Sequence, residues 1–310
     1  MTIQLSALIC TRDRADVLRL ALASLTTQTI DPALFEVIVV DNGSSDHTRQ
    51  VVESFSGRVA GLRYLYAPVP GLSRARNAAW QAAQGRYVAF LDDDAEARPD
   101  WAAGYLATFT SWHPTPGSIG GKAEPIFDAP RPDWLSDRLL PQLSIVDLGD
   151  EPFFLAADQW VAGCNLAFTV EALRAAGGFR EALGRVGDRL ISGEETYLRQ
   201  ELDRLGFRTL YHPGMVVGHH LAPARLSKRW FRRHATGTGQ TEAILLGVAG
   251  PLPPGRRLLL ALRKLAWMLA RAPLALLPGD AGARFRRELQ LYEAWGFLTA
   301  IGRVSGSADR

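Results

Sequence analysis

The chain of 310 residues is poor in several features that mark common classes of protein. It has only two cysteines, Cys10 and Cys164, so no disulfide framework is implied and a reducing, cytoplasmic setting is expected. No basic segment precedes the first apolar run, and we expect no secretory signal. The most apolar stretch, Leu258–Leu277, is interrupted by arginine, lysine and proline, which argues against a membrane-spanning helix.

Two further absences limit the folds that the chain can adopt. The chain shows no internal repeat. No Gly-x-Gly-x-x-Gly follows the first predicted strand, which ends in the residues Cys10–Arg14, and this argues against a classical dinucleotide-binding fold.

Charge is unevenly distributed along the chain, although the net charge is only +3. Residues 1–224 contain 20 Lys and Arg against 27 Asp and Glu, whereas residues 225–310 contain 15 against 5. Such asymmetry indicates an anionic partner for the basic segment, either an anionic membrane surface or a nucleic acid.

What the chain does contain is an alternation of strand and helix patterns over its first hundred residues. Apolar runs predict strands at 3–10, 35–40, 62–66 and 87–91, and amphipathic patterns predict helices at 16–27, 46–56 and 73–84. Strands separated by helices form parallel βαβ units, so the fold class is α/β.

The remainder is less regular. Residues 113–159 are rich in proline around a predicted strand at 118–127, and further strands are predicted at 160–168, 208–211 and 215–219, with a helix at 192–205. Beyond residue 224 the pattern is helical and cationic. We therefore expect two domains, 1–224 and 225–310, and a disordered tail at 305–310.

The most informative feature is an acidic triplet at the end of a predicted buried strand. Asp92, Asp93 and Asp94 follow the run 86–91, and three adjacent carboxylates repel one another unless a cation neutralises them. Mg²⁺ and Mn²⁺ take oxygen ligands and often share their shell with substrate phosphates. The triplet predicts a metal–phosphate site at a strand carboxyl end; the alternative is that one acid caps the next helix.

Polar residues also follow the other predicted parallel strands. Thr11 and Asp13 come after the first, Asp41 after the second, and Arg76 after the third. Because parallel strands end at the same sheet edge, these residues should lie near the triplet. Asp41 could accept from a nucleobase and Arg76 could meet a phosphate; a plain turn and a surface salt bridge are the respective alternatives.

These pieces, taken in order, resemble a known family. The segments 9–14, 39–44, 75–77 and 90–94 look like family 2 glycosyltransferases of the GT-A fold. The resemblance covers about residues 1–220. It implies a mostly parallel central sheet with flanking helices, here with a helical C-terminal extension. It also implies a hexosyltransferase-type enzyme that moves a sugar from a nucleoside diphosphate sugar, UDP-sugar favoured, to a hydroxyl, with inversion and with Mn²⁺ or Mg²⁺.

The resemblance assigns roles position by position at the strand ends. Thr11, Asp13 and Asp41 match residues that line the nucleobase pocket. Arg76 matches a residue near the nucleoside and the diphosphate.

The resemblance also assigns residues of the acidic triplet and of a later strand to the donor site. Asp92 matches an acid on the ribose and donor side, Asp93 lies beside it in the donor site, and Asp94 matches the metal-binding acid of the Asp-x-Asp motif. Gly163 and Asn165 resemble a glycine-containing strand that flanks the donor sugar, where glycine permits close approach.

Two acids at the start of the predicted helix 192–205 are candidates for the catalytic base. Family members often have Gly-Glu-Asp there, and this chain has Gly193, Glu194 and Glu195. Glu195 stands at the position of the base, and Glu194 remains a rival. The alternative is that both acids only stabilise the helix N-terminus.

A histidine at a late strand end is a candidate metal ligand. His219 matches the place of a metal-binding histidine better than His220 does. With Asp92 and Asp94 it would complete a site that favours Mn²⁺, which accepts imidazole more readily than Mg²⁺ does.

The sequence indicates less about the role of the basic segment and about the acceptor than about the donor site. The stretch Leu258–Leu277 fits an amphipathic helix that lies on a membrane or packs on the core or a second subunit. The expected partners are a nucleoside diphosphate sugar, a hydroxyl acceptor that is lipid-linked or phosphate-bearing, and an anionic surface at the cytoplasmic face of the membrane. A homodimer is the alternative, and nucleic acid is not favoured.

Two other functions are alternatives to sugar transfer. A sugar-phosphate nucleotidyltransferase would be expected to carry an early glycine-rich loop, which residues 10–14 lack. A non-catalytic scaffold that binds membrane or nucleic acid would not need the intact acidic triplet.

Overall fold

The computed structural model describes residues 2–187, 190–248, 250, 252–278 and 280–303. The chain forms two compact units. The first comprises residues up to 126 together with 144–181 and 194–220, and the second comprises 127–143, 182–193 and the segment from 221 onward. The predicted tail at 305–310 lies outside the described residues.

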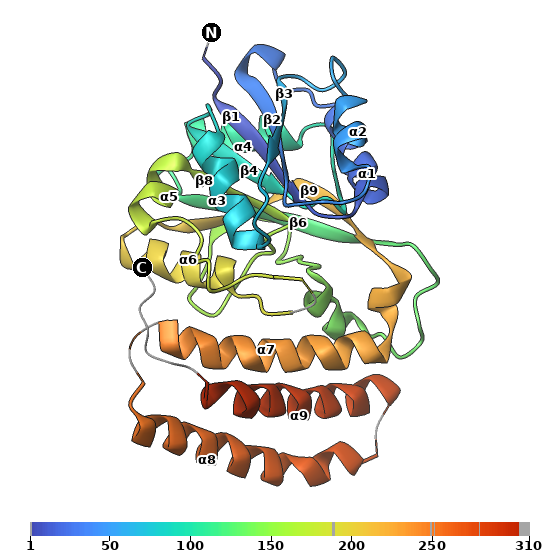
Figure 1. Cartoon of the computed structure of the whole chain (residues 1–310), viewed down its shortest axis with the longest axis vertical. Helices are drawn as coiled ribbons and strands as arrows, with labels where there is room; N and C mark the ends of the chain where they lie inside the picture. The colour runs from blue at the N-terminus through green and yellow to red at the C-terminus, as the bar shows by residue number, and fades with distance from the viewer. Residues whose placement is uncertain (1, 188–189, 249, 251, 279, 304–310) are drawn as a thin grey trace. The chain divides into compact units, whose positions relative to one another are not determined.

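A nine-stranded sheet organises the first unit (Figure 1). The strands run in the spatial order β3-β2-β1-β4-β8-β6-β9-β5, and β7 pairs with β9. In chain order they are β1 Leu5–Thr11, β2 Phe35–Asp41, β3 Leu62–Tyr66, β4 Tyr87–Leu91, β5 Ala95–Ala97, β6 Ser118–Phe127, β7 Phe153–Phe154, β8 Asn165–Thr169 and β9 Thr209–Leu221.

Parallel pairing joins the first four strands, with Leu8 opposite both Ile38 on β2 and Phe90 on β4. The pairs β4–β8, β6–β8, β5–β9 and β7–β9 are antiparallel. The α/β sheet as a whole is therefore mixed, and the expectation of a mostly parallel sheet was wrong in this respect. A parallel connection needs a crossover of a dozen or more residues. The chain has such crossovers before β4, whereas β5 begins four residues after β4 ends.

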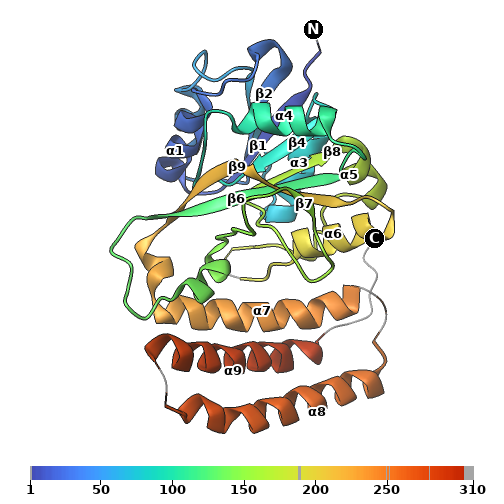
Figure 2. The same ribbon diagram turned by 180° about the vertical axis from the view of Figure 1, so that it is seen from behind.

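Helices cover both faces of the sheet. The helices of the first unit are α1 Ala15–Leu25, α2 Thr48–Glu53, α3 Leu72–Ala82, α4 Trp101–Ser111, α5 Val170–Ala176 and α6 Glu194–Arg204. Alternate residues of β1 point to opposite faces: Leu5 and Ile9 pack with α1, α2 and α4, whereas Leu8 packs with α3, α5 and α6. Figure 2 shows α4 on the face opposite α3.

Two predicted strand boundaries were wrong. The strand predicted at 160–168 begins only at Asn165, because residues 160–164 form an irregular segment and a turn. The strands predicted at 208–211 and 215–219 are one strand, β9. Pro213 and Gly214 lie inside it, and the Gly214 amide donates to His212 Nδ1 at 3.1 Å.

The second unit contains three long helices, α7 Lys228–Val248, α8 Pro254–Arg271 and α9 Ala281–Ile301. This unit also contains the 3₁₀ segments η2 Asp137–Leu143, η3 Pro223–Leu226 and η4 Ala272–Leu276, whereas η1 Pro32–Leu34 belongs to the first unit. In both views α9 lies between α7 and α8. Within the described ranges, none of the helices combines the length and the apolar character that crossing a bilayer requires.

Glycines allow α7 and α9 to approach closely. A Cβ on Gly239 would lie 1.8 Å from the carbonyl oxygen of Glu293, and one on Gly296 would lie 2.0 Å from that of Thr236. Real Cβ contacts are never this short, so the two backbones touch only because both residues lack a side chain.

Candidate active site

The acidic triplet occupies the short connection between β4 and β5. Asp93 and Asp94 are buried, whereas Asp92 is partly exposed. The site therefore begins at the carboxyl end of a central strand, where open α/β sheets bind their ligands.

Arg14, which follows β1, partly neutralises the triplet. Its guanidinium lies 2.9 Å from Asp93 Oδ1 through Nη1 and 2.8 Å from Asp94 Oδ2 through Nη2. Thr11 donates its hydroxyl to Asp93 Oδ2 at 2.7 Å. Burial raises the pKa of Asp93 to about 7; Arg14 and the Thr11 hydrogen bond oppose this rise, and the charge of Asp94 adds to it.

Arg14 was not among the residues that we assigned to the site from the sequence. The Thr11 hydroxyl, predicted to line the nucleobase pocket, points toward the triplet. Part of the signal was available, because β1 is parallel to β4 and residues that follow the two strands lie at the same sheet edge. That rule does not separate Arg14 from Arg12, which pairs with Asp13.

Three side chains are close enough to hold one metal ion. Ligand atoms of Asp92, Asp94 and His219 all lie within 4.8 Å of one another. His219 is brought there because its residue on β9 pairs with Ala95 on β5, and its Nε2 lies 3.1 Å from Asp94 Oδ1. Two carboxylates and an imidazole fit a divalent cation, and Arg14 fixes the orientation of the Asp94 carboxylate.

His220 is excluded from this cluster by strand geometry. Successive side chains of a strand point to opposite faces. His220 Nε2 accordingly lies 2.6 Å from Glu96 Oε1, while His219 faces Asp94.

Arg76 on α3 connects the donor-side acid to the two candidate bases. Its Nη1 donates to Glu195 Oε1 at 2.6 Å and to Glu194 Oε1 at 3.1 Å, and its Nη2 lies 3.5 Å from Asp92 Oδ1. The guanidinium is buried and lies 5.8 Å from the ring centre of Phe90. The alternative of a surface salt bridge is thus wrong for Arg76.

Glu194 and Glu195 form the first turn of α6, where carboxylates are favoured by the helix dipole. The Glu194 side chain is 3% exposed and that of Glu195 is 22% exposed. A Cβ on Gly163 would lie 1.9 Å from Glu195 Oε1 and 2.8 Å from Arg76 Nη2. Gly163 therefore makes room for the pair formed by Glu195 and Arg76.

The other strand-end acids hold loops together. Asp41 is buried and accepts from the Tyr64 hydroxyl at 2.7 Å and from the Ser44 amide at 2.8 Å. Asp13 has a φ of 51° and accepts from the Ser45 amide at 2.7 Å. Hydrogen bonds from Ser45 lower the pKa of the exposed Asp13. Both acids lie at the same sheet edge as the triplet.

Asn165 is fully buried on β8. Its Oδ1 accepts from Trp101 Nε1 and from the Tyr105 hydroxyl, both at 2.8 Å. Its Nδ2 donates to the carbonyl oxygens of Lys122 and Met215. The side chain therefore ties α4, β6 and β9 to β8, and in this structure it is turned into the core.

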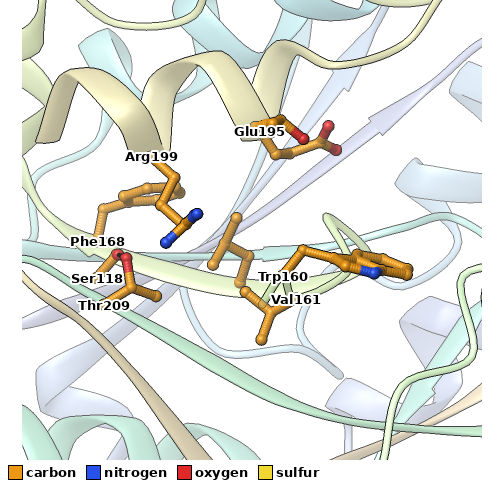
Figure 3. Close-up of a pocket in the computed structure, with 9 residues that line it drawn as sticks. Ser118, Trp160, Val161, Phe168, Glu195, Arg199 and Thr209 are labelled. Atoms are coloured by element: carbon orange, nitrogen blue, oxygen red, sulfur yellow. Dashed lines mark hydrogen bonds between the residues drawn. The ribbon is translucent and has the colours of Figure 1, made fainter. Parts of the chain in front are cut away.

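A cavity lies beside Glu195 (Figure 3). Its lining is mainly apolar, with Glu195, Thr196 and Arg199 supplied by α6. The other lining residues are Ser118, Trp160, Val161, Leu166, Phe168 and Thr209. Arg199 is tied down by a hydrogen bond from Nη2 to the carbonyl oxygen of Ala157 at 2.6 Å.

Comparison with known sequences points to one family. Residues 6–140 match the family described as glycosyl transferase family 2. A glucosyl-dolichyl phosphate glucuronosyltransferase of Haloferax volcanii is 22% identical over 245 residues, which cover 78% of this chain and 77% of that protein. Validoxylamine A glucosyltransferase of Streptomyces hygroscopicus subsp. limoneus is 32% identical over 154 residues, which cover 48% of this chain but only 34% of that enzyme.

Solved structures show the same fold. The mannosyltransferase PcManGT of Pyrobaculum calidifontis, in complex with GDP-Man and Mn²⁺, matches with a TM-score of 0.59 and 19% identity over 98% of this chain and 86% of that one. S. aureus TarS 1-349 in complex with UDP-GlcNAc matches with a TM-score of 0.53 and 17% identity over 97% and 90%.

The sheet, its acidic strand end and these matches define a glycosyltransferase with the GT-A fold. Residues 6–140 match glycosyl transferase family 2, in agreement with the resemblance found in the sequence. The fold class and enzyme class predicted from the sequence are thereby confirmed. The family match favours sugar transfer over the nucleotidyltransferase and scaffold alternatives.

Proposed function

We propose that this protein transfers a sugar from a nucleoside diphosphate sugar, with UDP-sugar favoured, to an acceptor hydroxyl, with inversion. One observation carries the proposal: Asp92, Asp94 and His219 converge at a strand end, and Arg76 connects that cluster to Glu194 and Glu195. The complexes of TarS with UDP-GlcNAc and of PcManGT with GDP-Man and Mn²⁺ support this choice of donor class.

The residues for a divalent cation are Asp92, Asp94 and His219, with Mn²⁺ favoured over Mg²⁺ because of the imidazole. A bound cation would neutralise charge that develops on the leaving diphosphate. Arg14 holds one oxygen of Asp94 and so leaves the other directed toward His219.

The accessible acid beside the cavity is Glu195, which supports its assignment as the general base. Glu194 is buried and does not line the cavity. Glu195 would take the proton of the acceptor hydroxyl as that oxygen attacks the anomeric carbon from the side opposite the departing diphosphate.

The pair between Glu195 and Arg76 must weaken before Glu195 can act. A guanidinium 2.6 Å away stabilises the carboxylate and makes it a weaker base. A diphosphate is a strong competitor for a guanidinium. Donor binding would thus draw Arg76 toward the phosphates and release Glu195, so that the base becomes active only when a donor is present.

The cavity next to Glu195 is the candidate acceptor site. Trp160, which is 41% exposed, offers an aromatic face for a sugar ring. Arg199 pairs with Asp203 at 3.2 Å, and a phosphate on the acceptor would compete with that carboxylate for the guanidinium. The Haloferax volcanii relative is named for a dolichyl phosphate substrate, which supports a lipid-linked acceptor. A cytoplasmic location and a catalytic domain at 1–224 complete the proposal.

Release of the nucleoside diphosphate tests this function. Purified protein is incubated with a panel of UDP- and GDP-sugars, with Mn²⁺, Mg²⁺ or EDTA. We expect UDP release that needs a divalent cation and fails in EDTA. Pyrophosphate release from a nucleoside triphosphate, with no turnover of any nucleotide sugar, would instead indicate a nucleotidyltransferase.

A further inference from the structure

The helix α8, Pro254–Arg271, turns a row of leucines to solvent. The exposed fractions are 61% for Leu258, 54% for Leu262, 38% for Leu265 and 62% for Leu269. Residues spaced by three and four positions share one face of a helix. These four side chains, here called the leucine row, therefore form one continuous apolar stripe.

The leucine row is not the face with which α8 packs in the second unit. Leu260, which lies on the other side of the helix, and Ala261, which lies at one margin of the row, pack against a small core that contains Phe297 and Ile301 of α9. In Figure 1 α9 lies on one side of α8 only. The row is thus a second apolar face.

The charges around the row have a single sign. Residues 243–279 contain no aspartate or glutamate. Their cations are Arg256, Arg257, Arg263, Lys264 and Arg271. Arg256 and Arg263 are exposed and, seven positions apart, lie on the same side of the helix. Lys264 already pairs with Glu242 at 2.7 Å.

We propose that the leucine row and its flanking arginines form a docking surface for an anionic lipid bilayer. The helix would lie in the plane of the interface with its leucines below the headgroups. Arginine side chains would extend along the apolar surface to reach lipid phosphates. Trp267, 38% exposed, is a residue type that favours this interface.

Charge argues against a second copy of the chain as the occupant. A two-fold dimer through the row would bring the arginines of both α8 helices together. Because residues 243–279 carry no acid, that helix offers no carboxylate to pair with them across such an interface. An anionic surface supplies the missing charge.

Vesicle sedimentation of the full chain tests the proposal. The probes are vesicles of pure phosphatidylcholine and of phosphatidylcholine with phosphatidylglycerol, each at low and at raised salt. We expect binding to the anionic vesicles that weakens, without vanishing, as salt rises, because the apolar part is not screened. Arg256→Ala and Arg263→Ala should each lower the partition coefficient about fivefold, since one cation contributes about 1 kcal/mol near such a surface.

The triple variant Leu258→Glu, Leu262→Glu, Leu269→Glu should lose vesicle binding at least tenfold. Glutamate is a good helix former and these positions face solvent, so the fold should survive. Leu20→Glu on α1, with 40% exposure, is the matched control and should bind vesicles like the parent.

Several results would overturn the proposal. One is failure of the parent protein to bind anionic vesicles at low salt, and another is binding of the triple variant that equals that of the parent. Light scattering could instead show a parent dimer that the triple variant separates, and the row would then be a subunit interface. The proposal does not rest on the sugar-transfer function: nucleotide binding, followed by thermal shift, should be equal in the parent and the triple variant.

Discussion

At the scale of single residues, the centre of the site is one buried arginine among acids. Burial would lower the pKa of Arg76, but Glu195, Glu194 and Asp92 hold that pKa above its ordinary value. Burying a charge is costly unless partners surround it, so this group must remain paired whichever ligand is bound. In the proposed mechanism a donor phosphate would replace a carboxylate in that role, and donor binding would then be coupled to the state of Glu195.

The two acids of α6 can be separated by isosteric substitution. Glu195→Gln should lower kcat roughly 10²-fold or more, which is typical of a lost general base, with little change in donor affinity. Glu194→Gln is the matched control, one residue away, and should keep more activity because the Glu194 side chain is only 3% exposed and does not line the cavity. Steady-state kinetics of both variants give the two losses of kcat. A larger loss in Glu194→Gln would show that Glu194, and not Glu195, is the general base.

The strand-end rule placed Asp41, Arg76 and Asp92 at one sheet edge from the sequence. It did not reveal which hydrogen bonds each would make. Arg14 was missed because a sequence does not show whether a loop cation turns toward the edge or toward solvent. Asn165 was predicted to lie in a strand that flanks the donor sugar. The sequence did not reveal that its side-chain amide points into the core.

At the scale of elements, glycines decide how α7 and α9 pack. Each helix contributes one residue, Gly239 or Gly296, whose missing side chain lets the partner backbone approach. Such contacts tolerate no added methyl group without a shift of a whole helix, because packed interiors leave no spare volume.

Gly296→Ala should therefore destabilise the protein by about 1–3 kcal/mol or more, the cost of overpacking. Gly255→Ala, at the start of α8 where a new Cβ would meet nothing within 4 Å, is the control. It should raise stability by up to ~1 kcal/mol, because alanine has fewer unfolded conformations. Urea denaturation measures both, and equal stability of the two variants would contradict this packing.

His234 on α7 gives the second unit a pH dependence. Burial lowers its pKa to about 4, with Arg185 and Arg225 adding to the shift. Its ring stacks on Trp230 with centroids 4.8 Å apart, and its Nδ1 has no hydrogen-bond partner among the described residues. Below pH 6.5 the unfolded chain takes up a proton that the folded chain refuses until about pH 4.

Stability should thus fall as the pH drops from 6.5 to 4, by up to about 3 kcal/mol from this group. His234→Phe keeps the stacked ring and has no proton to bind, so this part of the slope should disappear. Denaturant melts at pH 4.5 and 7.5 compare the two proteins. An identical pH slope in parent and variant would show that His234 titrates normally in the folded state.

Periodicity alone located most of the elements. The parallel strands β1 to β4 and helices α1 and α3 lie close to their predicted ranges, because each has an uninterrupted apolar pattern. The antiparallel half was harder. There the order β4-β8-β6-β9 joins strands distant in sequence, and their pairing depends on long-range contacts that no local pattern contains.

At the scale of the whole molecule, charge separates the two ends of the chain. Residues 1–224 carry an excess of acids and residues 225–310 an excess of bases. A nucleoside diphosphate sugar is itself anionic, so the acidic segment should bind it well only with help from local positive charge. Arg76 and a divalent cation on Asp92, Asp94 and His219 would supply that charge.

The most direct measurement is calorimetric titration of UDP into the full chain with Mn²⁺ and with EDTA. Parent protein should bind UDP with Mn²⁺ and at least tenfold more weakly in EDTA. Asp94→Asn should bind equally weakly in both, while Asp16→Asn, an exposed acid on α1, should behave as the parent does. Binding of UDP that is equally tight with Mn²⁺ and EDTA, or unchanged in Asp94→Asn, would contradict a metal-assisted donor site at this strand end.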